Sequence, residues 1–188
     1  PISTWRNPRG GAPPDTSSPR ATLESFLLLM HEADRLWLDV RSDYQAGGNF
    51  FLSGEQQRQL DIVRMFIDKA SEVFDLSDIP QTARASSAVE ITLQFQEILD
   101  RIYLPELEDV PGAAAGTFLD AQEAASLPAR WTLPGTDLVI AEAGTEKGEV
   151  RYLVSRQTVA RISDDYEAVK QFPSRADTGE DLYAHYIY

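Results

Sequence analysis

The chain has 188 residues, of which 43% are hydrophobic, and this is enough to bury the core of one domain. Thirty acidic and 17 basic residues give a formal net charge of -13 at pH 7, so the surface repels phosphate backbones and we expect no nucleic-acid partner. Because there is no cysteine, the chain has no disulfide, no thiolate nucleophile and no cysteine-based metal site.

The first segment, residues 1–17, is rich in proline, glycine, serine and threonine and has few side chains to bury. This composition predicts a disordered leader or linker, with a single domain over residues 18–188. The first 20 residues are basic, so the leader either folds back on the acidic body or is solvated, and solvation is the favoured alternative. The chain begins at Pro1 without a methionine or a signal sequence, so we expect it to be a piece of a longer product.

A first long helix is predicted from Pro19 to near Gln45. Ser18 is a suitable N-cap, and proline is well tolerated at the first helical position, where its missing N–H costs nothing. Glycine at 47 and 48 ends the helix. Steps of three and four residues produce one wide apolar face, made by Leu23, Phe26, Leu27, Met30, Ala33 and Trp37.

Two further helices are predicted, and the second should pack antiparallel to the first. The second begins at Ser53, where Gln56 completes a capping box, and it ends at the break over residues 75–80. The third runs from about Thr82 to Tyr103. Its inward positions are predicted to be Ala88, Ile91, Phe95, Ile98, Leu99 and Ile102, and its outward positions Glu90, Gln94, Glu97 and Arg101.

The rest of the chain predicts an extended excursion, a hairpin and a fourth helix. Residues 104–131 contain three prolines and a run of small residues, and they allow a short helical turn near residues 120–125. A strand over 138–142, a turn over 144–148 and a strand from Val150 then form a hairpin, which must lie against the helices because an isolated hairpin is marginal in water. Ser155 is a plausible N-cap for the last helix, whose apolar stripe consists of Val159, Ile162, Tyr166 and Val169.

The closing run, residues 182–188, holds three of the seven tyrosines in the chain. It is interpreted either as a final amphipathic turn packed on the body or as an approach to a membrane just beyond Tyr188, where tyrosine favours the headgroup region. The longest apolar run is Phe26–Met30, far below the 18 or so residues that a membrane-spanning helix needs.

No residues are predicted to be catalytic, to bind a cofactor or to ligate a metal, so we expect the domain not to be an enzyme. The only histidines, His31 and His185, are interpreted as boundary residues without a catalytic partner. The acidic pairs Asp164–Asp165 and Glu180–Asp181 are interpreted as helix caps or solvated groups, because adjacent side chains diverge. The group of Glu106, Glu108 and Asp109 is also interpreted as solvated, with loose calcium binding as the alternative. The three tryptophans, Trp5, Trp37 and Trp131, are interpreted as core or cover.

Four short stretches resemble, in the same order, the extracytoplasmic N-terminal region of a subgroup of bacterial MscS-type small-conductance mechanosensitive channels. They are Ser-Pro-Arg-Ala-Thr-Leu-Glu-Ser-Phe-Leu at 18–27, Asp-Leu-Ser-Asp-Ile-Pro at 75–80, Leu-Asp-Arg at 99–101, and the pattern of Ser155, Thr158, Val159, Ile162 and Tyr166. The stretches span most of the chain from Ser18 onward, and their residues are of capping and packing types, so the order carries the resemblance.

The resemblance implies a periplasmic accessory domain that precedes the membrane-spanning part of a homo-oligomeric channel and serves in sensing or assembly. The glycine- and alanine-rich pore helix of that family is not in this chain, so conduction is not expected of these residues. The implied partners are the rest of the channel subunit and its neighbouring subunits, with the membrane beyond Tyr188.

Two alternatives remain open. Residues 19–27 followed by a second helix also resemble the first helices of cone-shaped domains related to nuclear transport factor 2, which bind small molecules and include enzymes. That fold needs a long curved sheet of several strands, whereas the sequence predicts one hairpin. The second alternative is an adaptor that binds a partner protein through residues 104–131.

Overall fold

The computed structural model describes residues 12–47, 51–144 and 150–175. Within these ranges the chain is mainly helical with a small antiparallel sheet, which confirms the predicted mainly α, α+β class. The elements in chain order are α1 (Pro19–Gly47), α2 (Gly54–Ser71), α3 (Gln81–Leu99), the 3₁₀ helix η1 (Leu107–Asp109), α4 (Ala121–Ala125), β1 (Arg130–Thr132), β2 (Val139–Gly144), β3 (Val150–Val154), α5 (Arg156–Val159) and α6 (Ile162–Val169).

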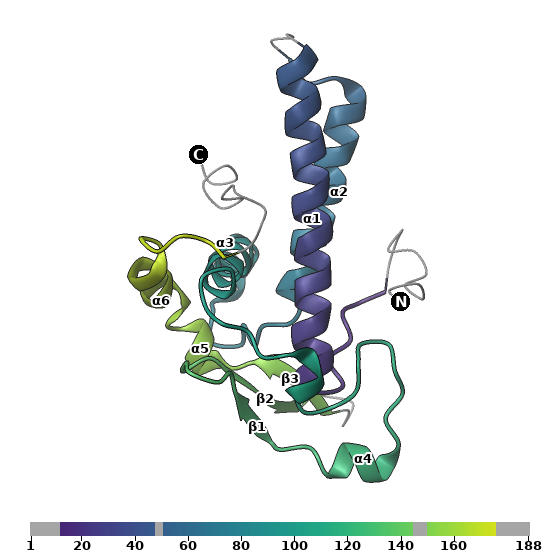
Figure 1. The fold of residues 1–188 in the computed structure, drawn as a ribbon, viewed down its shortest axis with the longest axis vertical. Coiled ribbons are helices and arrows are strands. Elements are labelled where there is room, and N and C mark those ends of the chain that lie inside the picture. The colour runs from purple at the N-terminus through teal and green to yellow at the C-terminus, as the bar shows by residue number, and fades with distance from the viewer. Residues whose placement is uncertain (1–11, 48–50, 145–149, 176–188) are drawn as a thin grey trace.

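Helices α1 and α2 form the antiparallel pair that the sequence predicts, and the pair projects as a long hairpin from the rest of the molecule (Figure 1). The predicted caps are confirmed. The Ala21 N–H donates to the Ser18 hydroxyl oxygen at 3.0 Å, and Ser53 and Gln56 form a reciprocal capping box at the start of α2. These caps supply partners for N–H groups that a helix cannot satisfy by itself.

Helix α3 lies between the hairpin and α6 (Figure 1), and all residues from 92 to 99 are buried. The prediction that Gln94 and Glu97 face outward is therefore wrong, since they are only 4% and 5% exposed. The prediction assumed one buried face, whereas α6 packs on a second side of α3. Arg101 pairs with Glu97 and so compensates the buried charge. The helix also ends at Leu99, earlier than the expected Tyr103.

The sheet has three strands in the order β1–β2–β3, so the predicted single hairpin is incomplete. The additional strand, β1, falls inside the expected excursion and pairs Trp131 with Ile140 of β2. With only three residues it is too short to show the alternation by which strands are recognised. The turn predicted over 144–148 and the closing run 182–188 lie outside the described residues, except Gly144 at the end of β2.

The outer edge of β3 is paired with two other segments. The Tyr152 N–H donates to the Thr16 carbonyl oxygen, and the Val154 N–H donates to the Val73 carbonyl oxygen, both at 2.8 Å. Thr16 is buried, so order begins before the expected boundary at Ser18, and the predicted leader is wrong for its last residues. A single backbone contact of this kind leaves no signal in the composition of residues 12–17.

The join after β3 begins as predicted and then departs from the prediction. Ser155 caps α5 by accepting a hydrogen bond from the Thr158 N–H. The expected continuous helix is instead broken between α5 and α6. Within α5 the Thr158 hydroxyl oxygen accepts from the Val139 N–H of β2 at 2.9 Å, and Ile162 and Tyr166 are buried on α6.

The excursion between α3 and β1 contains η1 and the short helix α4, which confirms the predicted helical turn near residues 120–125; Asp120 is its N-cap. It crosses the start of α1 at Gly112, which has a φ of +112° and lies against Ser18. A Cβ at this position would lie 2.2 Å from the Ser18 Cβ, so only glycine fits both the conformation and the contact.

Three phenylalanine rings join the layers at the centre of the core. Phe26 of α1, Phe74 after α2 and Phe95 of α3 pack edge to face, with ring centroids 5.8, 5.1 and 5.3 Å apart. All three side chains are at least 96% buried. This cluster connects the start of α1 and the end of α2, which together form the base of the hairpin, to α3.

We expect the substitution Phe95→Ala to lower the free energy of unfolding by about 3–5 kcal/mol, because it leaves a cavity within the aromatic cluster. Phe118→Ala is the matched control: that ring is 90% exposed, and its loss should change stability by no more than ~0.5 kcal/mol. Urea denaturation followed by circular dichroism measures both. Equal losses in the two variants would contradict this description of the core.

Candidate functional site

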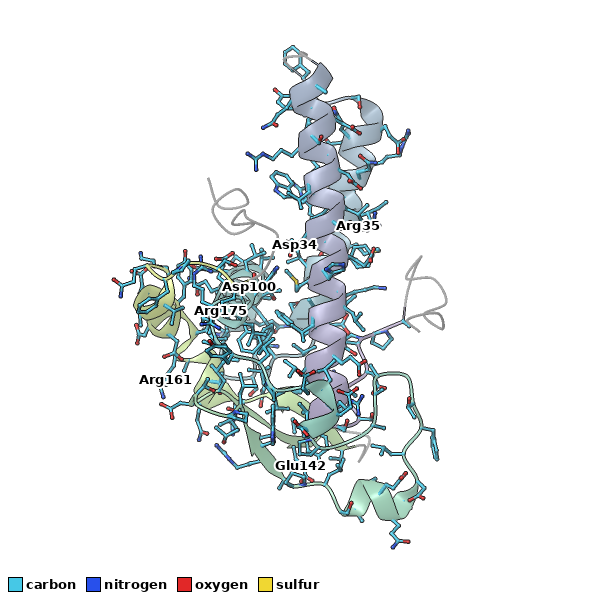
Figure 2. The ribbon with its side chains drawn as sticks, in the orientation of Figure 1. Asp34, Arg35, Asp100, Glu142, Arg161 and Arg175 are labelled. Atoms are coloured by element: carbon cyan, nitrogen blue, oxygen red, sulfur yellow. The ribbon has the colours of Figure 1, made fainter. Side chains whose placement is uncertain are left out.

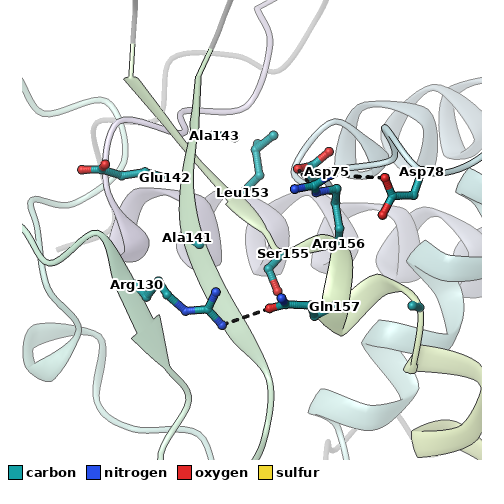
Figure 3. Close-up of a pocket in the computed structure, with 11 residues that line it drawn as sticks. Asp75, Asp78, Arg130, Ala141, Glu142, Ala143, Leu153, Ser155, Arg156 and Gln157 are labelled. Carbon is teal, nitrogen blue, oxygen red and sulfur yellow. Dashed lines mark hydrogen bonds and ion pairs between the residues drawn. The ribbon is translucent and has the colours of Figure 1, made fainter.

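A hollow of about 400 Å³ lies over the sheet, on the face opposite the core (Figure 3). The connection between α2 and α3 forms one wall, and the start of α5 together with Arg130 of β1 forms the other. The segments that meet here are far apart in the sequence, and two of them belong to the stretches that carry the family resemblance.

Small side chains make the floor of this hollow. The strand register places Arg130, Ala141 and Leu153 in one row across the sheet, with Ala143 beside them. Since side chains alternate between the faces of a strand, Glu142 points to the opposite face, where it accepts a hydrogen bond from the Tyr152 hydroxyl at 3.1 Å. The two alanine methyl groups leave space where larger side chains would fill the face.

The first wall carries an ion-pair group, which Arg156 of α5 completes from the other wall. The Arg156 guanidinium lies 3.6 Å from an Asp75 carboxylate oxygen and 3.3 Å from an Asp78 carboxylate oxygen. The pairs are largely solvent-exposed, so each contributes little to stability. Their effect on the site is to occupy the Arg156 donors and to add one net negative charge to this wall.

The second wall holds a cation without an acidic partner. The Arg130 Nη2 donates to the Gln157 amide oxygen at 3.1 Å, and no carboxylate of the described residues lies within ion-pair distance of this guanidinium. Arg151 is on the same face of β3, where it donates to the Thr16 hydroxyl oxygen and to the Glu72 carbonyl oxygen. Across the hollow, Arg130 and Arg156 are offset by Asp75 and Asp78, so Arg130 is a cation without a direct acidic partner and the hollow is not basic overall.

The polar side chains that line the hollow include one hydroxyl, two arginines, one glutamine and carboxylates. Its one hydroxyl nucleophile, that of Ser155, is buried and is committed to the Thr158 hydroxyl and N–H at the start of α5. Among the described residues, no histidine lines the hollow. Arg130, Gln157 and the alanine floor instead offer hydrogen-bond donors beside a small apolar surface.

A second unusual feature is a carboxyl group at the junction of α1 and α3. Asp34 lies on the side of α1 that faces α3, where its carboxylate accepts from the Gln96 amide (Figure 2). Burial raises the pKa of Asp34 to about 7, the Gln96 hydrogen bond opposes the rise, and the Asp100 charge adds to it. No sequence pattern indicated this group, because Asp34 falls beside the predicted apolar face and its partner is 62 residues away.

Two other hollows are more apolar. One, of about 850 Å³, lies beside the loop that carries Phe118 and next to Val150 of β3. The other, of about 640 Å³, lies at the tip of the α1–α2 hairpin, between Trp37 and Leu52. Neither contains a set of polar groups directed at one point.

The polar residues considered from the sequence do not converge on one site. His31 is exposed on α1, and His185, Glu180, Asp181 and Trp5 lie outside the described residues. Glu108 pairs with Arg20 at 3.7 Å, and Asp165 pairs with Arg161 at 3.3 Å. The described ranges contain no group of three or more histidine, cysteine, aspartate or glutamate side chains placed to hold a metal ion. Trp37 and Trp131 are partly buried against the core.

The chain matches no family model, no curated protein and no solved structure. Among the helices of the described residues, none has the length and apolar character needed to cross a membrane.

We expect Asp34→Asn to become more stabilising, relative to the unsubstituted chain, as pH rises from 4 to 7. In this window the unfolded chain releases the Asp34 proton, whose ordinary pKa is 3.8, whereas the folded chain retains it up to a pKa of about 7. The free energy of unfolding therefore falls with rising pH in the unsubstituted chain. The asparagine keeps a hydrogen bond to Gln96 but has no proton to lose.

Urea denaturation at pH 5 and pH 8 measures this difference. Asp61→Asn, which removes the same charge from an exposed position on α2, is the control. For each variant, the quantity compared is the change between pH 5 and pH 8 in its effect on the free energy of unfolding. If this change is zero for Asp34→Asn, or no larger than for Asp61→Asn, burial does not raise the pKa of Asp34.

Proposed function

We propose that this chain is a non-catalytic, periplasmic accessory domain of an MscS-type mechanosensitive channel, with a role in sensing or assembly. The observation that carries the proposal is the ordered resemblance of four stretches of the chain to the extracytoplasmic region of such channels. The family's pore lies outside these residues, so the domain acts on a pore formed elsewhere in the subunit.

The positions of the four stretches in the fold support this proposal, because each forms a joint between elements. Residues 18–27 begin α1 on the sheet, where the Thr22 hydroxyl donates to the Tyr152 carbonyl oxygen at 2.6 Å. Residues 75–80 connect α2 to α3. The Arg101 guanidinium at the end of α3 donates to the Phe172 carbonyl oxygen beyond α6. Residues that position the elements are those that a shared fold would require.

The fourth stretch meets the second one at the outer face of the sheet. Ser155 caps α5, and the next residue, Arg156, forms its ion pairs with Asp75 and Asp78. Two stretches that are 75 or more residues apart in sequence thus make one contact. The contact places the two stretches side by side in the fold, although Arg156 itself is not among the residues that carry the resemblance.

The shape of the domain also fits a role in sensing or assembly. The α1–α2 hairpin extends well beyond the sheet (Figure 1), and such an extension offers a long surface for contact with the partners we propose, which are other parts of the same subunit and neighbouring subunits of a homo-oligomer. The formal charge of -13 disfavours nucleic acid. A domain of this kind modulates a pore only if its contacts differ between the pore's states.

One alternative keeps a specific observation in its favour. An adaptor that binds a partner protein through residues 104–131 would use Phe118, whose ring is 90% exposed at the apolar hollow of that segment. The alternative related to nuclear transport factor 2 has less support, because that fold needs a long curved sheet and the described sheet has three strands of three to six residues. Strand content from circular dichroism of the whole chain separates this alternative.

Deletion of residues 18–170 from the full-length channel subunit should leave a conducting pore with an altered gating tension or altered subunit assembly. The reason is that the deletion removes the contacts that differ between the states of the pore, while the pore itself remains. Patch-clamp recording under graded suction measures the tension, and crosslinking counts the subunits.

Replacement of residues 18–170 by an unrelated soluble domain of equal size is the control for lost bulk. The proposal fails if the deleted and the intact channels have the same gating tension and assembly. It also fails if the parent sequence has no hydrophobic helices within a few dozen residues after Tyr188.

A further inference from the structure

We infer that the hollow on the outer face of the sheet is a binding site for a singly charged carboxylate, with Arg130 and Gln157 as its hydrogen-bond donors. Ala141, Ala143 and Leu153 would contact a short apolar body attached to that carboxylate. The inference depends only on the geometry of this hollow and does not require the channel role.

The Arg130 guanidinium has donors available for a ligand. Of its five N–H groups, one donates to the Gln157 amide oxygen, and no carboxylate of the described chain competes for the others. The planar fork of a guanidinium matches the two oxygens of a carboxylate, and such bidentate pairs are among the stronger hydrogen-bonded contacts. The Gln157 amide N–H₂, which has no partner among the described residues, lies beside it and adds two further donors.

Arg130 is solvent-exposed, and one hydrogen bond positions it at the hollow. Its side chain lies along the sheet over Ala141 and reaches Gln157 (Figure 3), so the contact holds the guanidinium at the hollow. Arg84, which is also exposed, donates to the Ile79 carbonyl oxygen, whereas three other exposed arginines pair with acids. Arg35 pairs with Glu32 and Asp39, Arg58 with Glu55, and Arg161 with Asp137 and Asp165.

The charges around the hollow select for one negative charge. Arg156 is already balanced by Asp75 and Asp78 on the opposite wall, which leaves Arg130 as the uncompensated cation. A phosphate dianion would meet the two aspartates and the chain's formal charge of -13 with only one guanidinium to offset it. A carboxylate carries a charge equal and opposite to that of Arg130.

The dimensions of the hollow suit a small ligand group. Its volume of about 400 Å³ is at the lower end of the range for small-molecule pockets. The floor presents methyl groups from Ala141 and Ala143, against which an alkyl chain of a few carbons can pack. Two sources supply this chemistry: a free monocarboxylate, and the carboxylate at the C-terminus of a polypeptide.

Amide chemical shifts in two-dimensional NMR test the site on the whole chain. Propionate serves as the free carboxylate and N-acetylalanine as the mimic of a polypeptide C-terminus. Propionamide and N-acetylalanine amide are the neutral counterparts, and sodium chloride at equal ionic strength corrects for salt. We expect saturable shifts at Ala141, Ala143 and Gln157 with at least one acid, and at least tenfold weaker binding of its amide.

Two variants and a control decide whether Arg130 carries the binding. Arg130→Gln should weaken the acid at least tenfold, because it removes a charge-assisted pair. Ala141→Leu fills the floor while it leaves the guanidinium in place, and it should also abolish binding. Arg58→Gln removes an equally exposed arginine from α2 and should bind as the unsubstituted chain does. Circular dichroism of each variant verifies the fold.

The outcomes assign the source or overturn the site. Binding of propionate supports a free carboxylate, whereas binding of N-acetylalanine alone supports a polypeptide terminus. The inference is overturned if neither acid shifts these amides, if the amides of the ligands bind equally well, or if Arg130→Gln binds unchanged. Tighter binding of inorganic phosphate than of either acid would also overturn the argument from charge.

Discussion

Strand β3 is the segment on which the arrangement of the others depends. Its Tyr152 carbonyl accepts the hydroxyl of Thr22, 130 residues away on α1. One edge of the strand pairs with β2, and the other donates to the carbonyl oxygens of Thr16 and Val73. A buried backbone group without a partner costs about 1–3 kcal/mol, so these bonds together strongly favour one placement of the leader's end, the hairpin and the sheet.

The position of β3 then determines what each face of the sheet meets. Tyr152 and Val154 point into the core, where the aromatic cluster of the helices covers them. Leu153 points to the other face, which is flanked by the α2–α3 connection and by α5. Because β1 and β2 place an arginine and small alanines there, the face remains hollow and holds a guanidinium without a direct acidic partner. The candidate site thus exists because the helices of the core cover one face of the small sheet and leave the other face open.

Local patterns in the sequence were sufficient for the helices and insufficient for the contacts between distant segments. The caps at Ser18, Ser53 and Ser155 and the apolar stripes of α1 and α2 were predicted, because each depends on neighbours within four residues. Burial of Glu97 and pairing of Thr16 with β3 were missed, since each requires a segment far along the chain. Arg130 was missed as a site residue for the same reason, because its row of the sheet is formed by three strands.

The walls of the hollow connect its occupancy to the rest of the fold. One wall is the α2–α3 connection, which ends the hairpin, and the other begins α5, which continues into α6. The Arg156 ion pairs with Asp75 and Asp78 are the direct link between these walls, and their exposure makes that link weak. A group bound in the hollow changes the spacing of the walls only if it contacts both of them. Its effect on the hairpin is bounded by the difference in its binding free energy between the two spacings, because a ligand with equal contacts in both shifts neither.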